Sequence, residues 1–189
     1  MYYYWKNGFD EKDCNELIDK YSSTDLTQAS IGGGPEEASN VDSDVRKTSV
    51  CFLEPNELFS RALWSYVLEA NAKNFNYLIS GAQKAQFSKY EVGDFYEWHK
   101  DSTDTQSTND LDSIIPVRKL SAVVQLSKEE DYEGGELQFF NGSHDPEKLP
   151  IGKQGSVIVF DSGDWHRATP VTKGIRYSLV LWATGKRSR

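Results

Sequence analysis

From Ala85 onward, short runs of strand-forming residues alternate with turn residues, and this half of the chain constrains the fold most. The runs lie at residues 85–90, 95–99, 119–126, 136–140, 156–160 and 175–183. Glycine or proline stands in most of the gaps between them. Many short strands with this punctuation are typical of a β-sandwich or barrel. We therefore expect such a body in the second half of the protein.

The first half of the chain has a helical pattern instead. Residues 10–21 and 57–78 repeat apolar side chains with the helical period, and the first of these segments begins with acidic residues. Residues 30–43 contain three consecutive glycines and a proline, which is loop chemistry, whereas residues 47–53 are rich in strand formers. The order predicts an α+β fold in one domain spanning residues 1–189.

Charge and composition narrow the range of partners. The chain has 29 acidic and 21 basic residues, and a net charge of −8 repels a phosphate backbone, so nucleic acid is disfavoured. No apolar run reaches the roughly 18 residues that cross a bilayer, and the N-terminal residues lack a secretion signal. Cys14 and Cys51 form no CxxC pattern and are expected to be reduced packing residues. We expect a cytoplasmic protein with no membrane partner.

The 3 histidines of the chain are His99, His144 and His166. His99 and Asp101 are two residues apart, which puts both side chains on one face of a strand, although this pair alone is a weak signal. His166 follows an apolar strand and a turn. Two imidazoles and one carboxylate match the facial arrangement that holds Fe(II) and leaves three positions open. An all-histidine zinc site is the weaker alternative, because His144 stands in a turn sequence.

Arg176 begins a strand on which it shares one face with Ser178. A lone arginine on an apolar strand is costly unless its guanidinium meets an anion. Its planar fork suits the far carboxylate of a dicarboxylate, and an internal salt bridge to Asp or Glu is the alternative. On the strand at residues 119–126, Ser121 and Gln125 lie on the face opposite the leucines. This polar face predicts a pocket wall.

Ordered motifs connect these residues. They are Tyr90-x2-Gly93-x2-Tyr96-x2-His99-x-Asp101, Arg118-x-Leu120-Ser121, Gly134-Gly135-Glu136-Leu137, residues 155–160, residues 166–171 and Gly174-x-Arg176-Tyr177-Ser178. Together they resemble the 2-oxoglutarate and Fe(II)-dependent dioxygenases. Within that superfamily they resemble the prolyl 4-hydroxylase-like branch, which includes the bacterial PKHD-type hydroxylases. The resemblance covers about residues 45–184.

The resemblance implies a fold and a site. The implied fold is a double-stranded β-helix, or jelly roll, with the N-terminal helices packed on one sheet. The implied ligands of Fe(II) are His99, Asp101 and His166, and Arg176 is expected to pair with the distal carboxylate of 2-oxoglutarate. Further side chains that line or hydrogen-bond the co-substrate are expected at Tyr90, Gln125 and Ser178. Relatives often have tyrosine where this chain has Gln125.

The resemblance also implies an activity, in which O2 and 2-oxoglutarate are consumed, succinate is formed and a C–H bond is hydroxylated. Ascorbate is expected as a further cofactor on the same resemblance. A peptidyl proline is the favoured target, a free amino acid or other small metabolite is one alternative, and a metal-free ligand-binding barrel is another. The acidic loops 32–43 and 102–116 favour a basic peptide that they would cover. The oligomeric state stays open.

Overall fold

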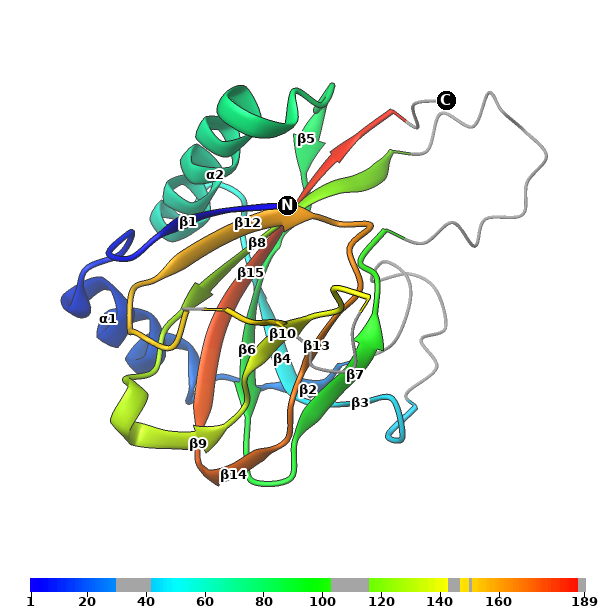
Figure 1. Cartoon of the computed structure of the whole chain (residues 1–189). Helices are drawn as coiled ribbons and strands as arrows, with labels where there is room; N and C mark the ends of the chain where they lie inside the picture. The colour runs from blue at the N-terminus through cyan, green and yellow to red at the C-terminus, as the bar shows by residue number, and fades with distance from the viewer. Residues whose placement is uncertain (30–41, 103–115, 143–146, 150, 187–189) are drawn as a thin grey trace.

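The computed structural model describes residues 1–29, 42–102, 116–142, 147–149 and 151–186, and its described strands form two main antiparallel sheets (Figure 1). The larger sheet has the order β1 (Tyr2–Trp5), β12 (Val157–Asp161), β8 (Val117–Gln125), β15 (Arg176–Gly185), β6 (Ala85–Tyr90), β4 (Ser49–Leu53) and β2 (Thr27–Gln28), and β5 (Gly81–Ala82) also pairs with β15. The smaller sheet has the order β11 (Glu147–Lys148), β10 (Leu137–Phe139), β13 (His166–Ala168), β7 (Phe95–His99) and β3 (Arg46–Lys47). A separate pair joins β14 (Val171–Gly174) to β9 (Tyr132–Gly134). This arrangement is the double-stranded β-helix that the motifs implied.

Two helices cover the side of the larger sheet that faces away from the smaller one (Figure 1). Helix α1 (Glu11–Tyr21) is preceded by the N-cap residue Asp10, whose carboxylate accepts from the backbone N–H of Asp13 at 2.7 Å and so caps the first turn. Helix α2 (Leu58–Ala70) carries a more apolar face, and its Leu63 is fully buried. Burial of such a leucine stabilises the fold by about 1.5–3 kcal/mol. No described helix is long and apolar enough to cross a membrane.

The prediction of one helix over residues 57–78 was wrong at its C-terminal end. Helix α2 ends at Ala70, a π-helical turn follows over Asn71–Phe75, and Asn76 adopts a left-handed φ of 56°. The Asn71 side chain binds the backbone N–H and carbonyl of Tyr77 at 2.9 and 3.0 Å, which stabilises the reversal. Asparagine tolerates this conformation better than most residues, so the helix terminates there.

The strands of the larger sheet separate apolar from polar side chains. On β8 and β15, Leu120, Val124, Leu179 and Leu181 point toward the helices and are buried in the main core. The alternate positions point toward the smaller sheet, where a second apolar cluster that includes Phe139 joins the two sheets. The polar side chains of those alternate positions therefore lie between the sheets, as the alternation in the sequence predicted.

The two cysteines were expected to be reduced packing residues. Cys14 and Cys51 are free thiols, in agreement with their expected role in packing. Burial raises the pKa of Cys14 to about 12, so this thiol is kept in its neutral form.

His144 lies outside the described residues, and so do the acidic loops 32–43 and 102–116 apart from their ends.

Candidate active site

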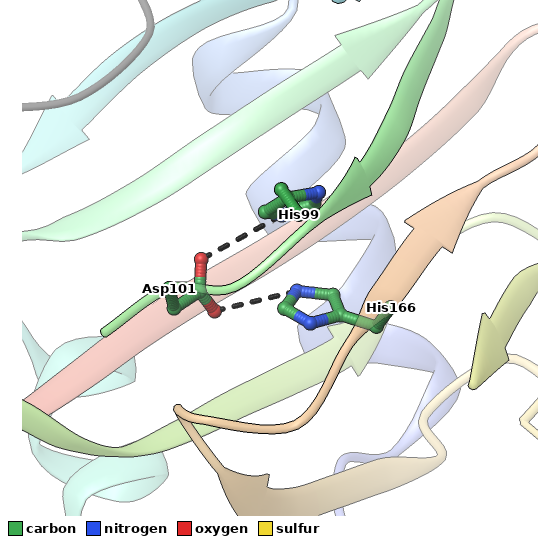
Figure 2. Close-up of side chains that lie close together, drawn as sticks. All are labelled: His99, Asp101 and His166. Atoms are coloured by element: carbon green, nitrogen blue, oxygen red, sulfur yellow. Dashed lines mark ion pairs between the residues drawn. The ribbon is translucent and has the colours of Figure 1, made fainter. Parts of the chain in front are cut away.

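Strands β7 and β13 bring the two distant halves of the predicted metal site together. His166 lies directly opposite His99 in the antiparallel pairing of these strands, and Asp101 follows β7 by two residues (Figure 2). The Asp101 Oδ1 atom is 3.7 Å from His99 Nε2, and its Oδ2 atom is 3.5 Å from His166 Nε2. One possible ligand atom from each residue lies within 4.8 Å of the others. The three side chains thus converge on one point.

The backbone orients both imidazole rings toward that point. The Nδ1 atom of His99 is 2.7 Å from the Glu97 carbonyl, and Nδ1 of His166 is 2.9 Å from the Asp164 carbonyl. A carbonyl only accepts, so each Nδ1 carries a proton, and Nε2 of each neutral ring presents its lone pair to the centre. Both rings are therefore held in the tautomer that a metal ion requires.

The charges of the three groups complement one another. Burial, and then the neighbouring His166, lowers the pKa of His99 to about 3, so this ring is neutral at pH 7. Burial works against ionisation of Asp101, but His166, His99 and Arg118 outweigh it and hold the pKa of Asp101 well below its usual range. Burial likewise opposes the charged form of His166, but Asp101 outweighs it and raises the pKa of His166. The site contains a buried carboxylate that attracts a cation.

The donor set and its surroundings fit Fe(II). Two imidazole nitrogens and one carboxylate oxygen form the set found in non-haem iron oxygenases, and it leaves coordination positions for other molecules. Tyr96 stacks on His99 with ring centroids 3.4 Å apart, and Phe160 meets His166 edge-on at 4.8 Å. These rings limit the movement of the ligands and shield them from water.

The second predicted part of the site lies on the larger sheet. Arg176 begins β15 beside Tyr90 on β6, and its guanidinium carbon is 5.5 Å from the centre of the Tyr90 ring. Its Nε atom donates to Gln125 Oε1 on β8 at 3.0 Å. Arg176 is only 4% exposed, and within the described residues no carboxylate forms an ion pair with it. The internal salt bridge that the sequence left open is not formed by this part of the chain.

Ser178 and Gly135 complete the surroundings of Arg176. Ser178 is buried and pairs with Gln125 in the register of β15 and β8. Gly135 has a φ of +60°, and a Cβ atom there would lie 2.9 Å from Arg176 Cδ. The sequence showed Gly134-Gly135 as a motif but gave Gly135 no role, and the structure shows that a side chain would displace the arginine.

The fold and the site together define a class of protein, a non-haem iron oxygenase built on a double-stranded β-helix. Residues 85–184 match the 2OG-Fe(II) oxygenase superfamily, and the chain belongs to that superfamily. Its members use Fe(II) with 2-oxoglutarate as co-substrate. His99, Asp101 and His166 form the facial triad of this chain.

Individual relatives agree with this assignment. The chain is 30% identical over 135 residues to a PKHD-type hydroxylase of Synechococcus sp. (strain CC9605), a match that covers 69% of this chain and 56% of the relative. It spans about half the length of the curated relatives that it matches.

Solved structures share the fold. A Pseudomonas putida prolyl-4-hydroxylase superimposes with a TM-score of 0.72 at 17% identity and covers 99% of this chain and 93% of its own. A Trichoplax adhaerens prolyl hydroxylase, in complex with a hypoxia inducible factor oxygen degradation domain peptide fragment, gives a TM-score of 0.72 at 18% identity over 96% of this chain and 82% of its own.

Proposed function

We propose that this oxygenase hydroxylates a prolyl residue within a peptide or protein. The oxygenase part of this proposal rests on one observation. The chain has both a facial triad and a buried arginine that has no acidic partner among the described residues. The names of the relatives support the prolyl part, since they are PKHD-type and prolyl hydroxylases and one of them was solved with a peptide.

Strand β8 connects the two parts of the proposed pocket. Ser121 contacts Asp101, and Gln125, four residues further on the same strand face, contacts Arg176. Four residues of strand span roughly 13 Å, and the long arginine side chain shortens the gap. We infer that 2-oxoglutarate lies along this span, with one carboxylate at Arg176 and the other end at the triad.

Each residue has a distinct role in the proposed reaction. The Nε2 atoms of His99 and His166 and the carboxylate of Asp101 hold Fe(II), and Arg176 binds the distal carboxylate of 2-oxoglutarate. Tyr90, Gln125 and Ser178 line the co-substrate site. Bound iron supplies the oxidising chemistry that inserts one oxygen atom of O2 into a C–H bond while 2-oxoglutarate becomes succinate and carbon dioxide. The protein orients the reactants and keeps water out.

The substrate test uses mass spectrometry. Purified protein is incubated with Fe(II), 2-oxoglutarate and O2, together with either prolyl peptides or free proline, and each product is searched for a gain of one oxygen atom. We expect modification of the proline in peptides, with succinate formed in equal amount and none formed by Asp101→Ala. Oxygenation of free proline as efficiently as of any peptide would assign the small-metabolite alternative instead.

The net charge of −8 leads us to propose a basic peptide as the preferred substrate. Electrostatic attraction of this kind weakens as salt screens it. We therefore expect basic prolyl peptides to react faster than acidic ones at low salt, and the difference to shrink at high salt. Equal rates under all conditions would remove the charge preference and leave the prolyl assignment intact.

A further inference from the structure

We propose that Ser121 and Ser162 are positioning residues that hold the Asp101 carboxylate in the orientation that metal binding requires. Asp101 differs from the two histidines because it lies beyond the end of β7 and gains no orientation from strand pairing. Its side chain must be held by other contacts. The proposal rests on the metal site of the proposed function and is independent of the substrate.

Ser121 provides the direct contact. It lies on β8, its exposed fraction is 0%, and its Oγ atom donates to Asp101 Oδ2 at 2.6 Å. A hydroxyl bound to a carboxylate at this distance forms a short, charge-assisted hydrogen bond. The motif Arg118-x-Leu120-Ser121 was evident in the sequence, but no part of the proposed reaction had assigned Ser121 a role.

Ser162 acts through Ser121. Its Oγ atom is 2.8 Å from Ser121 Oγ, and its exposed fraction is also 0%. An ionised carboxylate can only accept, so the single hydroxyl proton of Ser121 is committed to Asp101. Ser162 must therefore be the donor between the two serines. The chain of donors runs in one direction, from Ser162 to Ser121 to Asp101.

The backbone around Ser162 strengthens the arrangement. The N–H of Ser162 donates to the Lys119 carbonyl at 3.0 Å, and the carbonyl of Ser162 accepts from the N–H of Ser102 at 2.8 Å. Ser102 directly follows Asp101, so the segment that bears the carboxylate is tied to this turn. The same turn contains Asp164, whose carbonyl orients the ring of His166. One turn between β12 and β13 therefore contacts both the segment that carries Asp101 and the ring of His166.

The hydrogen bond from Ser121 also restricts rotation of the Asp101 carboxylate. Part of the accepting capacity of Oδ2 is used by Ser121, whereas Oδ1 lies on the side of His99. A carboxylate held in this way cannot rotate freely. Loss of the serine hydroxyl would free this rotation and weaken the facial arrangement.

The test measures the affinity of the isolated protein for Fe(II) under anaerobic conditions, by calorimetry and without substrate. For Ser121→Ala we expect a Kd about 10–100-fold higher than that of the unmodified protein, the range found when partners of metal ligands are removed. Ser162→Ala should weaken binding less, because the bond from Ser121 to Asp101 remains. The double variant should match Ser121→Ala, since Ser162 acts only through Ser121.

Two further variants separate positioning from general damage to the fold. Ser121→Thr keeps the hydroxyl on a residue that strands accept, and it should recover most of the affinity that Ser121→Ala loses. Ser60→Ala removes a buried hydroxyl on α2 that has no hydrogen-bond partner among the described residues, and it should bind Fe(II) normally. Thermal unfolding of the metal-free proteins shows whether each variant is folded.

The possible outcomes distinguish failure of the positioning role from failure of the metal site itself. A folded Ser121→Ala protein with unchanged Fe(II) affinity would overturn the positioning role. So would a Ser162→Ala protein that loses as much affinity as Ser121→Ala, because the direction of the donor chain would then be wrong. If the unmodified protein binds no Fe(II), the metal site of the proposed function fails instead.

Discussion

The two ends of the proposed pocket differ in how their charges are satisfied. At the triad, the Asp101 carboxylate is surrounded by His99, His166 and the hydroxyl of Ser121, and every side chain has a defined orientation. At the other end, the Arg176 guanidinium is buried beside neutral groups, and the described residues supply no anion. The first end is arranged to receive a cation, and the second is arranged to receive an anion.

This difference indicates how each end should respond to mutation. The triad depends on three groups acting on one ion, so removal of any one of them should disable the whole centre. The arginine end depends on one cation, and its neighbours Gln125 and Gly135 help to hold that cation in place. Changes at this end should therefore act on 2-oxoglutarate alone and leave metal binding intact.

The largest effect is expected from the ligands. His99→Ala, Asp101→Ala and His166→Ala should each abolish turnover, because two remaining ligands cannot hold Fe(II) in a facial site. Succinate formation and Fe(II) affinity measure the loss, and circular dichroism shows whether the fold is retained. Full activity in any one of these variants at limiting iron would remove that residue from the metal site.

A smaller and more selective effect is expected at Arg176. Arg176→Ala should raise the 2-oxoglutarate concentration needed for half-maximal turnover about ten- to a hundredfold, because a charge-assisted hydrogen bond contributes about 1.5–3 kcal/mol. Fe(II) affinity should stay close to that of the unmodified protein. Arg176→Lys keeps the charge but loses the planar fork, so its effect should lie between the two. Equal loss of iron and 2-oxoglutarate binding would show that the two ends are not separate.

The sequence predicted the strands and side chains of the metal site better than the contacts that surround them. The strands at residues 85–90 and 95–99 are β6 and β7 with the same bounds, because both have a regular pattern and flanking turn residues. The alternation on residues 119–126 correctly placed Ser121 and Gln125 on one polar face. Local pattern and residue chemistry were sufficient for these features.

Other features depend on specific contacts and not on a repeating pattern of residues. The strand at Tyr2–Trp5 forms only by pairing with β12, more than 150 residues away, and its aromatic residues show no alternation that would predict it. The helix end at Ala70 depends on Asn71 reaching Tyr77. The contact between Ser121 and Ser162 joins residues 41 positions apart. No local periodicity in the sequence encodes contacts of this kind.

A carboxylate introduced beside Arg176 should satisfy the charge of its guanidinium, so the arginine end would no longer be arranged to receive an external anion. Gln125→Glu would place an acidic group where Gln125 Oε1 now accepts from Arg176 Nε at 3.0 Å. The internal ion pair would compete with 2-oxoglutarate, and we expect about a tenfold higher requirement for the co-substrate. Gln125→Ala removes a neutral side chain that accepts from Arg176 and donates to the Ser127 carbonyl, introduces no competing charge, and should have a smaller effect. The measurement is the dependence of succinate formation on 2-oxoglutarate, and an unchanged requirement in Gln125→Glu would place the co-substrate elsewhere.

The smallest effect is expected at Gly135, where the absence of a side chain leaves room for Arg176. In Gly135→Ala, the new Cβ would lie 2.9 Å from Arg176 Cδ and 3.0 Å from Val171 Cγ2, so the arginine must shift. The backbone φ of +60° adds strain of about 1–2 kcal/mol for any L-residue with a side chain. We expect a lower thermal midpoint and a several-fold weaker 2-oxoglutarate affinity, roughly 1 kcal/mol, with Fe(II) affinity unchanged.

Gly142→Ala is the matched control for this change. Gly142 has a φ of +82°, but a Cβ atom there would meet no atom of the described residues within 4 Å. It carries similar backbone strain without any contact to the arginine, so it should lower the thermal midpoint and leave 2-oxoglutarate affinity unaltered. Because both variants share the backbone cost, the difference between their 2-oxoglutarate affinities isolates the displacement of Arg176. If the two variants bind 2-oxoglutarate equally well, the position of Arg176 tolerates this displacement, and Gly135 serves only the turn in which it lies.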